Sequence, residues 1–226
     1  MMDISISKVL MKIFDWSEVW GVLIPLVVLF RLRKKQPDHF WPVIVYLWFA
    51  LAINLVADII QDFKHYLPFW MQKNNVLYNV HSVVRFVCFS YFFSLLYPTR
   101  FTALKKILPV IFIVFLTVNF SIAENFLYPE HISGNLHAAE SFLLLIYCMS
   151  YYLAELKEDK KFLLTGKDFL VVTGLSLYVA TNFFIFLFYV PMLSYNRDLA
   201  VNMWNVHNAA YIMLCLFIAR SFYANA

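Results

Sequence analysis

The chain has 226 residues, of which 62% are apolar and 14% charged, with a formal net charge of +4 and a mean hydropathy of +0.69. An average soluble domain is roughly 45–50% apolar and about 25% charged, so a water-soluble globule of this composition would expose large apolar patches. The composition also excludes a disordered chain, and the small, scattered positive charge excludes a nucleic-acid-binding protein, which leaves a polytopic membrane protein.

Seven stretches are long and apolar enough to cross a bilayer, whose core of about 30 Å needs roughly 20 helical residues. A spanning segment must be helical here because lipid offers no hydrogen-bond partner to free backbone groups. The predicted fold is therefore all-α, a single seven-helix transmembrane domain over residues 1–226. The spans cover about residues 14–30, 41–62, 76–97, 104–121, 134–153, 168–190 and 200–221.

Features at the ends and inside these spans add detail in chain order. Residues 1–13 mix apolar side chains with lysines and are too short for a cleaved signal peptide, which predicts a short interfacial helix on the outer surface. Asp15 and Glu18 open the first span, where negative charge suits the helix dipole. Pro25 and Pro109 lie inside the first and fourth spans and should bend them slightly. The fourth span has almost no polar residue, and we expect it to face lipid.

Lys and Arg residues in the connections predict the orientation of the bundle. One side carries twelve of them: Arg31, Arg33, Lys34, Lys35, Arg100, Lys105, Lys106, Lys157, Lys160, Lys161, Lys167 and Arg220. The other side carries five: Lys8, Lys12, Lys64, Lys73 and Arg197. The richer side should be cytoplasmic, which places the N-terminus outside and the C-terminus in the cytoplasm. We expect a multi-pass protein of the plasma membrane, in a bacterial inner membrane.

Polar side chains inside the spans are costly in lipid, so their positions carry the functional information. At about 1.5 Å of rise per residue, they gather roughly 6–14 Å below the outer surface, whereas the inner halves of the same spans are nearly all apolar. This layer predicts an outward-facing polar pocket lined by Asn54, Asp58, Tyr78, His81, Arg85, His137, Glu140, Asn182, Asn205 and His207.

Arg85 requires a partner, because an unpaired guanidinium at that depth would cost several kcal/mol. Asp58 is the partner that the depths suggest. The pair either ties the second and third spans together or leaves Arg85 a free donor that anchors an anionic group of a ligand.

Three imidazoles and a carboxylate at similar depth could also hold a metal. The candidate ligands of a zinc or iron ion are His81, His137, Glu140 and His207, with Asp58 holding a ligand histidine in the required tautomer. The favoured alternative is that each histidine simply hydrogen-bonds a neighbouring Tyr or Asn between helices.

The sequence lacks the motifs that define three known families of seven-helix membrane proteins. Residues 200–221 contain no lysine for a retinal Schiff base, and the third span ends Ser94-Leu95-Leu96-Tyr97 without the Asp-Arg-Tyr of G-protein-coupled receptors. The Ser-x-x-x-His and His-x-x-x-His motifs of alkaline ceramidases are missing as well. The chain resembles small stand-alone seven-helix bacterial membrane proteins in its aromatic third span, its Glu140 and Asn182, and the stretch 204–208. That resemblance implies the fold and no activity.

The sequence therefore favours an outward-facing pocket that binds a small ligand or a metal ion, in a receptor-like or accessory role. The expected partners are the lipid bilayer, a small ligand or lipid, and another membrane protein. One alternative is an intramembrane metal-dependent lipid hydrolase, in which His81, His137 and His207 hold the metal that activates water. A weaker alternative is a b-type haem protein that uses two of these histidines.

Overall fold

The computed structural model describes residues 12, 14–32, 35–68, 72–96, 102–124, 132–157 and 166–224. All regular structure in these ranges is helical, as predicted. The seven α-helices there are α2 (Ser17–Leu32), α3 (Trp41–Phe63), α4 (Asn75–Leu96), α5 (Thr102–Val118), α6 (Gly134–Leu156), α7 (Lys167–Tyr195) and α8 (Arg197–Tyr223). Short helical turns extend them: η1 (Asp38–Phe40) precedes α3, η2 (Lys64–Tyr66) follows it, and a π-helical turn, η4 (Asn119–Ala123), follows α5.

Six of these seven α-helices are long and apolar enough to cross a membrane, which indicates a multi-pass membrane protein. The exception is α2, which has 16 residues and so measures about 24 Å, less than a bilayer core of about 30 Å. Its position agrees with the first predicted span, and a crossing by α2 stays a prediction. The expected interfacial helix over residues 1–13 lies outside the described residues, Lys12 excepted.

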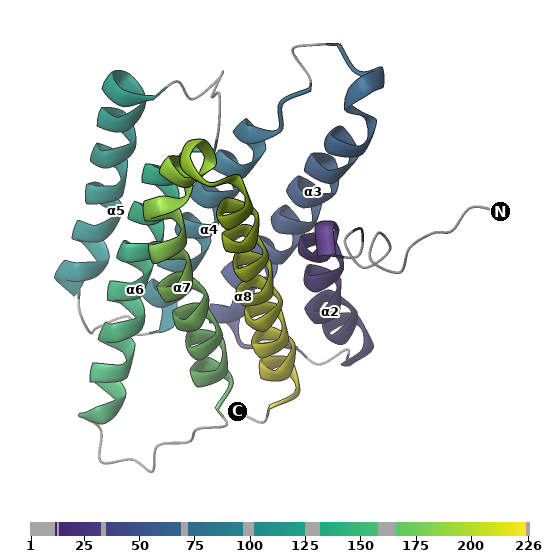
Figure 1. Ribbon diagram of the computed structural model, residues 1–226. Coiled ribbons are helices and arrows are strands. Elements are labelled where there is room, and N and C mark those ends of the chain that lie inside the picture. Colours follow the sequence, from purple (N-terminus) through teal and green to yellow (C-terminus); the bar gives the residue numbers. More distant parts are fainter. Residues whose placement is uncertain are drawn as a thin grey trace.

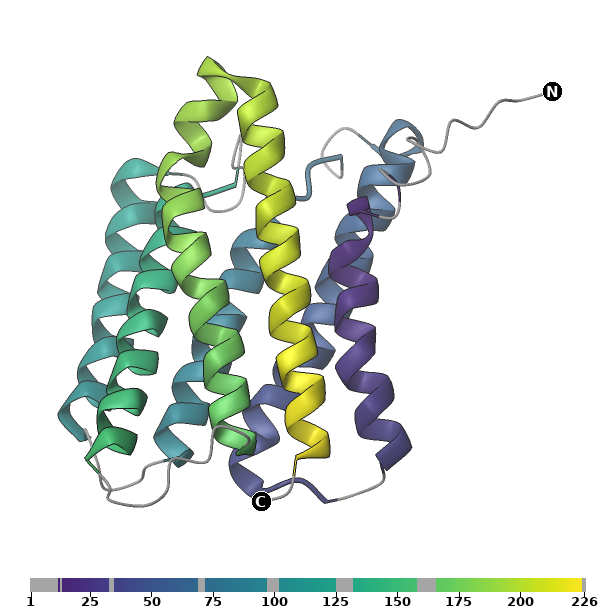
Figure 2. The same cartoon turned by 60° about the horizontal axis from the view of Figure 1, so that its bottom comes forward.

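The helices run alternately up and down, and α2, α3, α4, α6, α7 and α8 form a closed ring (Figures 1 and 2). The ring closes because α2 packs against both α3 and α8. We call the end of the bundle at which α3, α5 and α7 finish the upper end, as it stands in Figure 1, and the opposite end the lower end.

Helix α5 lies outside this ring, against α4 and α6. Only Leu108 and Phe112 of α5 are buried, whereas Val110, Ile113 and Val114 are more than half exposed. Helix α5 therefore lies at the periphery of the bundle, while its contact with lipid stays a prediction. The polar residues considered below lie on the other six helices.

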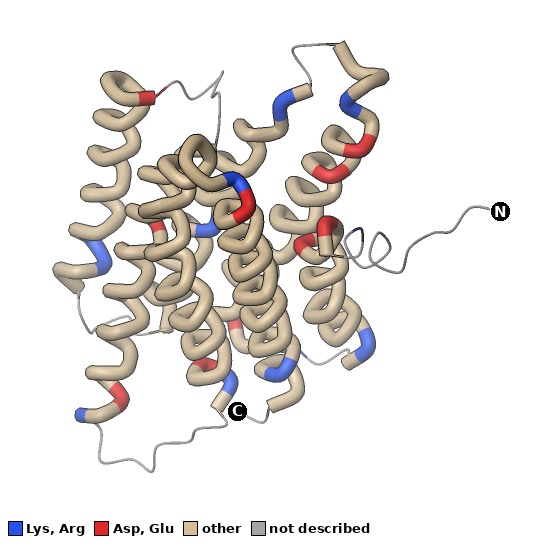
Figure 3. Tube along the Cα trace, viewed as in Figure 1, with Lys and Arg blue, Asp and Glu red and all other residues tan. Residues whose placement is uncertain are grey.

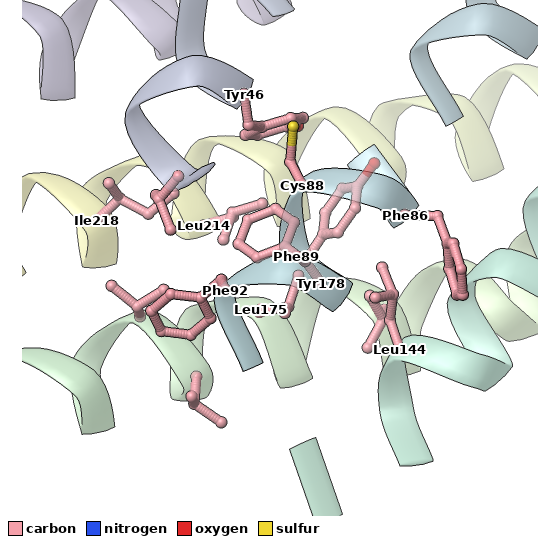
Figure 4. Close-up of a cluster of buried hydrophobic side chains, with 14 of the residues drawn as sticks. Tyr46, Phe86, Cys88, Phe89, Phe92, Leu144, Leu175, Tyr178, Leu214 and Ile218 are labelled. Atoms are coloured by element: carbon pink, nitrogen blue, oxygen red, sulfur yellow. The ribbon is translucent and has the colours of Figure 1, made fainter. Parts of the chain in front are cut away.

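The middle and lower part of the ring is filled by apolar side chains (Figure 4). This cluster includes Phe89 and Phe92 of α4, Leu144 of α6, Leu175 of α7 and Leu214 of α8, and all five are fully buried. Between helices in lipid, close packing supplies the attraction that the hydrophobic effect supplies in water.

Helices α7 and α8 approach each other closely at Gly174. A Cβ atom at this position would lie 2.5 Å from the Cβ of Phe217, nearer than two such atoms can come. The absence of a side chain thus allows the two backbones to pack at this crossing.

Basic residues mark the lower end of the bundle. Figure 3 shows Lys and Arg at the lower ends of α2, α6, α7 and α8, which carry Arg31, Lys157, Lys167 and Arg220. Of the twelve basic residues assigned to this side, Arg33, Lys34, Arg100, Lys160 and Lys161 lie outside the described residues.

Candidate functional site

The centre of the ring holds a buried ion pair between Arg85 of α4 and Glu140 of α6. Nε and Nη2 of Arg85 each donate to one carboxylate oxygen of Glu140 at 2.6 Å, and Nη1 donates to the hydroxyl of Tyr178 on α7 at 2.6 Å. Ser82, one turn before Arg85 on the same face of α4, donates to Glu140 at 2.5 Å. Two parallel charge-assisted bonds are the strongest arrangement open to this pair, so the group joins three helices rigidly.

The predicted pairing of Arg85 with Asp58 is wrong. All three guanidinium nitrogens are used by Glu140 and Tyr178, because the ring places α6 and α7 across from this face of α4. These bonds use three of the five N–H donors of Arg85, whose side chain is only 2% exposed. Its role as an anchor for an anionic ligand stays a prediction. Asp58 lies higher, on α3, and faces a pocket at the upper end of the bundle.

A second buried polar group lies beside the ion pair and includes a residue outside the predicted pocket, Glu18 of α2. Nδ1 of His207 lies 2.6 Å from Oδ1 of Asn182, and its Nε2 lies 3.2 Å from Oε1 of Glu18. Asn54 donates to the backbone carbonyl of Glu18 at 3.4 Å and to the hydroxyl of Tyr211 at 3.5 Å. These contacts join α2, α3, α7 and α8.

Glu18 could have been found from its helical spacing. It lies three, four and seven residues before Gly21, Val22 and Pro25, and all four are buried on one face of α2. A carboxylate on that stripe must point into the bundle and needs a partner there. The helix-dipole interpretation missed this role.

The other two histidines have aromatic neighbours and few polar ones. His81 stacks on Tyr46, with ring centres 5.7 Å apart, and meets Tyr211 edge-on. His137 stacks on Phe186 at 4.4 Å. Both nitrogens of His137 and Nε2 of His81 are buried without a hydrogen-bond partner in the described part of the chain.

The geometry gives the metal hypothesis no support. Among the described residues, no group of three or more His, Cys, Asp or Glu side chains is arranged to hold a metal ion. Of the four proposed ligands, Glu140 is bound by Arg85 and His207 lies between Asn182 and Glu18. The hydrolase and haem hypotheses depend on the same histidines and stay predictions.

A pocket of about 420 Å³ opens at the upper end between the residues just before α2 and the helices α3, α4, α7 and α8. Three predicted pocket residues line it: Asp58, Tyr78 and Asn205. The remaining wall consists of Asp15, Trp16, Gln61, Asp62, Asn74, Ile132, Tyr189, Val201 and Trp204. The other predicted residues are buried in the ring and do not line it: Asn54, His81, Arg85, His137, Glu140, Asn182 and His207.

Carboxylates and aromatic rings dominate the chemistry of this pocket. Asp58 is only 9% exposed, and its Oδ2 has no hydrogen-bond partner among the described residues. Asp62, on the rim, pairs with Lys12. The indole of Trp204 contacts the rings of Tyr78, edge-on, and of Tyr189, each with its ring centre 5.6 Å away. Such a surface attracts positive charge.

Trp204 also connects the pocket to the buried polar groups. Its ring centre lies 5.0 Å from that of His207, one turn further along α8. His207 in turn contacts Glu18 and Asn182. Trp204 thus links the wall of the pocket to the polar group that joins α2 to α7 and α8.

Comparison of the chain with models of protein families, with curated proteins and with solved structures finds no match. The resemblance to small seven-helix bacterial membrane proteins thus depends on the residue pattern alone. The pocket and the buried pairs carry the functional argument.

Proposed function

We propose that this chain is a membrane protein that binds a small organic cation in its upper pocket, in a receptor-like role. The supporting observation is the carboxylate of Asp58, which lines the pocket, is nearly buried and keeps one oxygen without a partner among the described residues. A buried carboxylate without a cation is costly, and an ammonium ligand would remove that cost.

The walls of the pocket fit such a ligand in size and in chemistry. A volume of about 420 Å³ falls in the range of roughly 300–1,000 Å³ that is typical of small-molecule sites. Trp16, Tyr78, Tyr189 and Trp204 supply aromatic faces, and an ammonium group is attracted to such a face within about 6 Å of the ring centre.

The proposal includes an orientation and a setting. The upper end faces outward, because the lower end carries most of the basic residues of the connections. The setting is a bacterial inner membrane, with the ligand arriving from the extracytoplasmic side. Binding would be passed through Trp204 and His207 to the helix packing, and from there to a partner protein in the membrane.

The test uses choline and its uncharged carbon analogue, 3,3-dimethyl-1-butanol, with the purified full chain in detergent micelles. Calorimetry should detect binding of choline and not of the alcohol. Asp58→Asn should weaken binding roughly tenfold or more, since the electrostatic attraction between the carboxylate and the quaternary ammonium is lost.

The matched control is Asp198→Asn, which removes an exposed carboxylate at the same end but outside the pocket. This variant should bind choline like the unmodified chain. Equal binding of the alcohol, or unchanged choline binding by Asp58→Asn, would show that the pocket is not a cation site.

A further inference from the structure

A second cavity, of about 220 Å³, lies on the outside of the ring between α4 and α5. Its walls are almost wholly apolar and include Phe86 and Tyr91 of α4 and Ile113 of α5. Tyr91 and Ile113 are more than half exposed, at 54% and 61%, so the cavity is a groove that opens sideways towards lipid. It is separate from the upper pocket and shares no residue with it.

The sequence explains why a groove remains here. α4 presents Ser90 and Ser94, two small residues one turn apart, where the rest of this stretch is rich in Phe. Ser94 bonds the carbonyl of Ser90 on its own helix and therefore does not reach towards α5. At the upper end of the groove the rings of Phe86 and Phe112 stack with centres 3.8 Å apart and close it.

A cation stands at the lower end of the groove. Nζ of Lys105 on α5 donates to the carbonyl oxygen of Ser94 at 3.4 Å, which uses one of its three donors. The sequence from 86 to 118 contains no Asp or Glu, whereas it contains Arg100, Lys105 and Lys106. An anionic group at the lower end of the groove would thus be attracted by Lys105 and would not be repelled by any acidic side chain of α4 or α5.

We propose that the groove binds an anionic phospholipid from the leaflet at the lower end of the bundle. An acyl chain lies along the groove between Ser94 and Phe86, a length of about 12 Å of helix. The ammonium of Lys105 binds the phosphate of the headgroup. The positive charge of Lys105 favours an anionic lipid over a neutral one. Basic residues that bind anionic head groups occur on the cytoplasmic side of membrane proteins.

The first experiment tests the charge. The purified chain is placed in nanodiscs containing phosphatidylcholine with a small fraction of phosphatidylglycerol, and lipids that stay bound on release are counted by native mass spectrometry. Phosphatidylglycerol should be enriched, and Lys105→Gln should reduce the enrichment about fivefold, the factor expected from one lysine at an anionic surface. Lys106→Gln, with the same charge change on an exposed neighbour, should keep it.

The second experiment tests the groove. Ile113→Trp places a large ring at the rim and should lower phosphatidylglycerol retention, whereas Ile111→Trp, on an exposed position outside the groove, should not. Glycerol 3-phosphate, which has the headgroup charge without acyl chains, should not displace the lipid. Equal retention of the two lipids, equal effects of the two lysine variants or displacement by glycerol 3-phosphate would overturn the proposal.

Discussion

The guanidinium of Arg85 and the carboxylate of Glu140, on the neighbouring helices α4 and α6, face each other through two hydrogen bonds of 2.6 Å inside the helix ring. Arg85 is 2% exposed and Glu140 is fully buried. Each buried charge offsets the desolvation cost of the other, so removing one of them leaves the other uncompensated and destabilises the fold.

We expect Arg85→Met and Glu140→Gln each to lower the free energy of unfolding by about 3–5 kcal/mol, because each leaves a buried group without its partner. The double variant should lose less than the sum of the single losses. Unfolding by dodecyl sulfate in mixed micelles measures these differences.

As the control, Lys12→Met and Asp62→Asn remove the partly exposed pair on the pocket rim and should cost only about 0.2–1 kcal/mol each. Additive losses at Arg85 and Glu140 would contradict a coupled pair.

Replacement by phenylalanine should lower stability at His207 and not at His137. His207→Phe removes the partner of Asn182 and Glu18 and should cost about 1–3 kcal/mol. His137→Phe keeps the stack on Phe186 and removes two buried nitrogens that have no hydrogen-bond partner in the described ranges, so stability should stay level or rise. The same unfolding assay applies. A large loss in His137→Phe would indicate an unseen partner, and metal analysis of that variant would then examine the zinc or iron hypothesis directly.

Glycines at 21 and 174 offer a matched pair. Gly174→Ala puts a methyl group against Phe217 and should destabilise the contact of α7 with α8 by about 1–3 kcal/mol. At Gly21 the nearest atom to a new methyl group, Cγ1 of Ile212, lies at 3.7 Å, an ordinary contact. Gly21→Ala should therefore be neutral or gain up to about 1 kcal/mol from helix propensity. Thermal unfolding in micelles distinguishes the two, and equal effects would show that α7 and α8 are not in close contact at Gly174.

Much of the architecture could be predicted from the sequence because the bilayer limits the choices. Span length and apolar composition define the helices, and the lack of polar residues between 107 and 116 marks α5 as peripheral. The requirement that Arg85 have a buried partner also follows from its depth alone. These conclusions concern one helix at a time.

The neighbours of each helix could not be predicted in this way. Asp58 and Glu140 lie at similar predicted depths on the two helices that adjoin α4, α3 and α6. Only the direction in which each side chain points decides that Glu140 meets Arg85 while Asp58 lines the upper pocket. The helical spacing of Glu18 indicates that it points into the bundle, but its contact with His207 could not be predicted, since that contact depends on α2 packing against α8. The predicted layer of polar residues consequently divides into two buried groups, several singly placed side chains and a separate pocket above them.

The orientation of the bundle and the crossing by α2 can be tested together by labelling single cysteines with a maleimide that does not cross membranes. Phe14→Cys and Tyr66→Cys, at the upper end, should react in intact cells, whereas Asp38→Cys and Leu156→Cys, at the lower end, should react only after permeabilisation. The background should be low because the native cysteines, Cys88, Cys148 and Cys215, are buried. Reaction of both Phe14→Cys and Asp38→Cys in intact cells would show that α2 does not cross, and the reverse pattern at all four positions would invert the bundle and place the pocket in the cytoplasm.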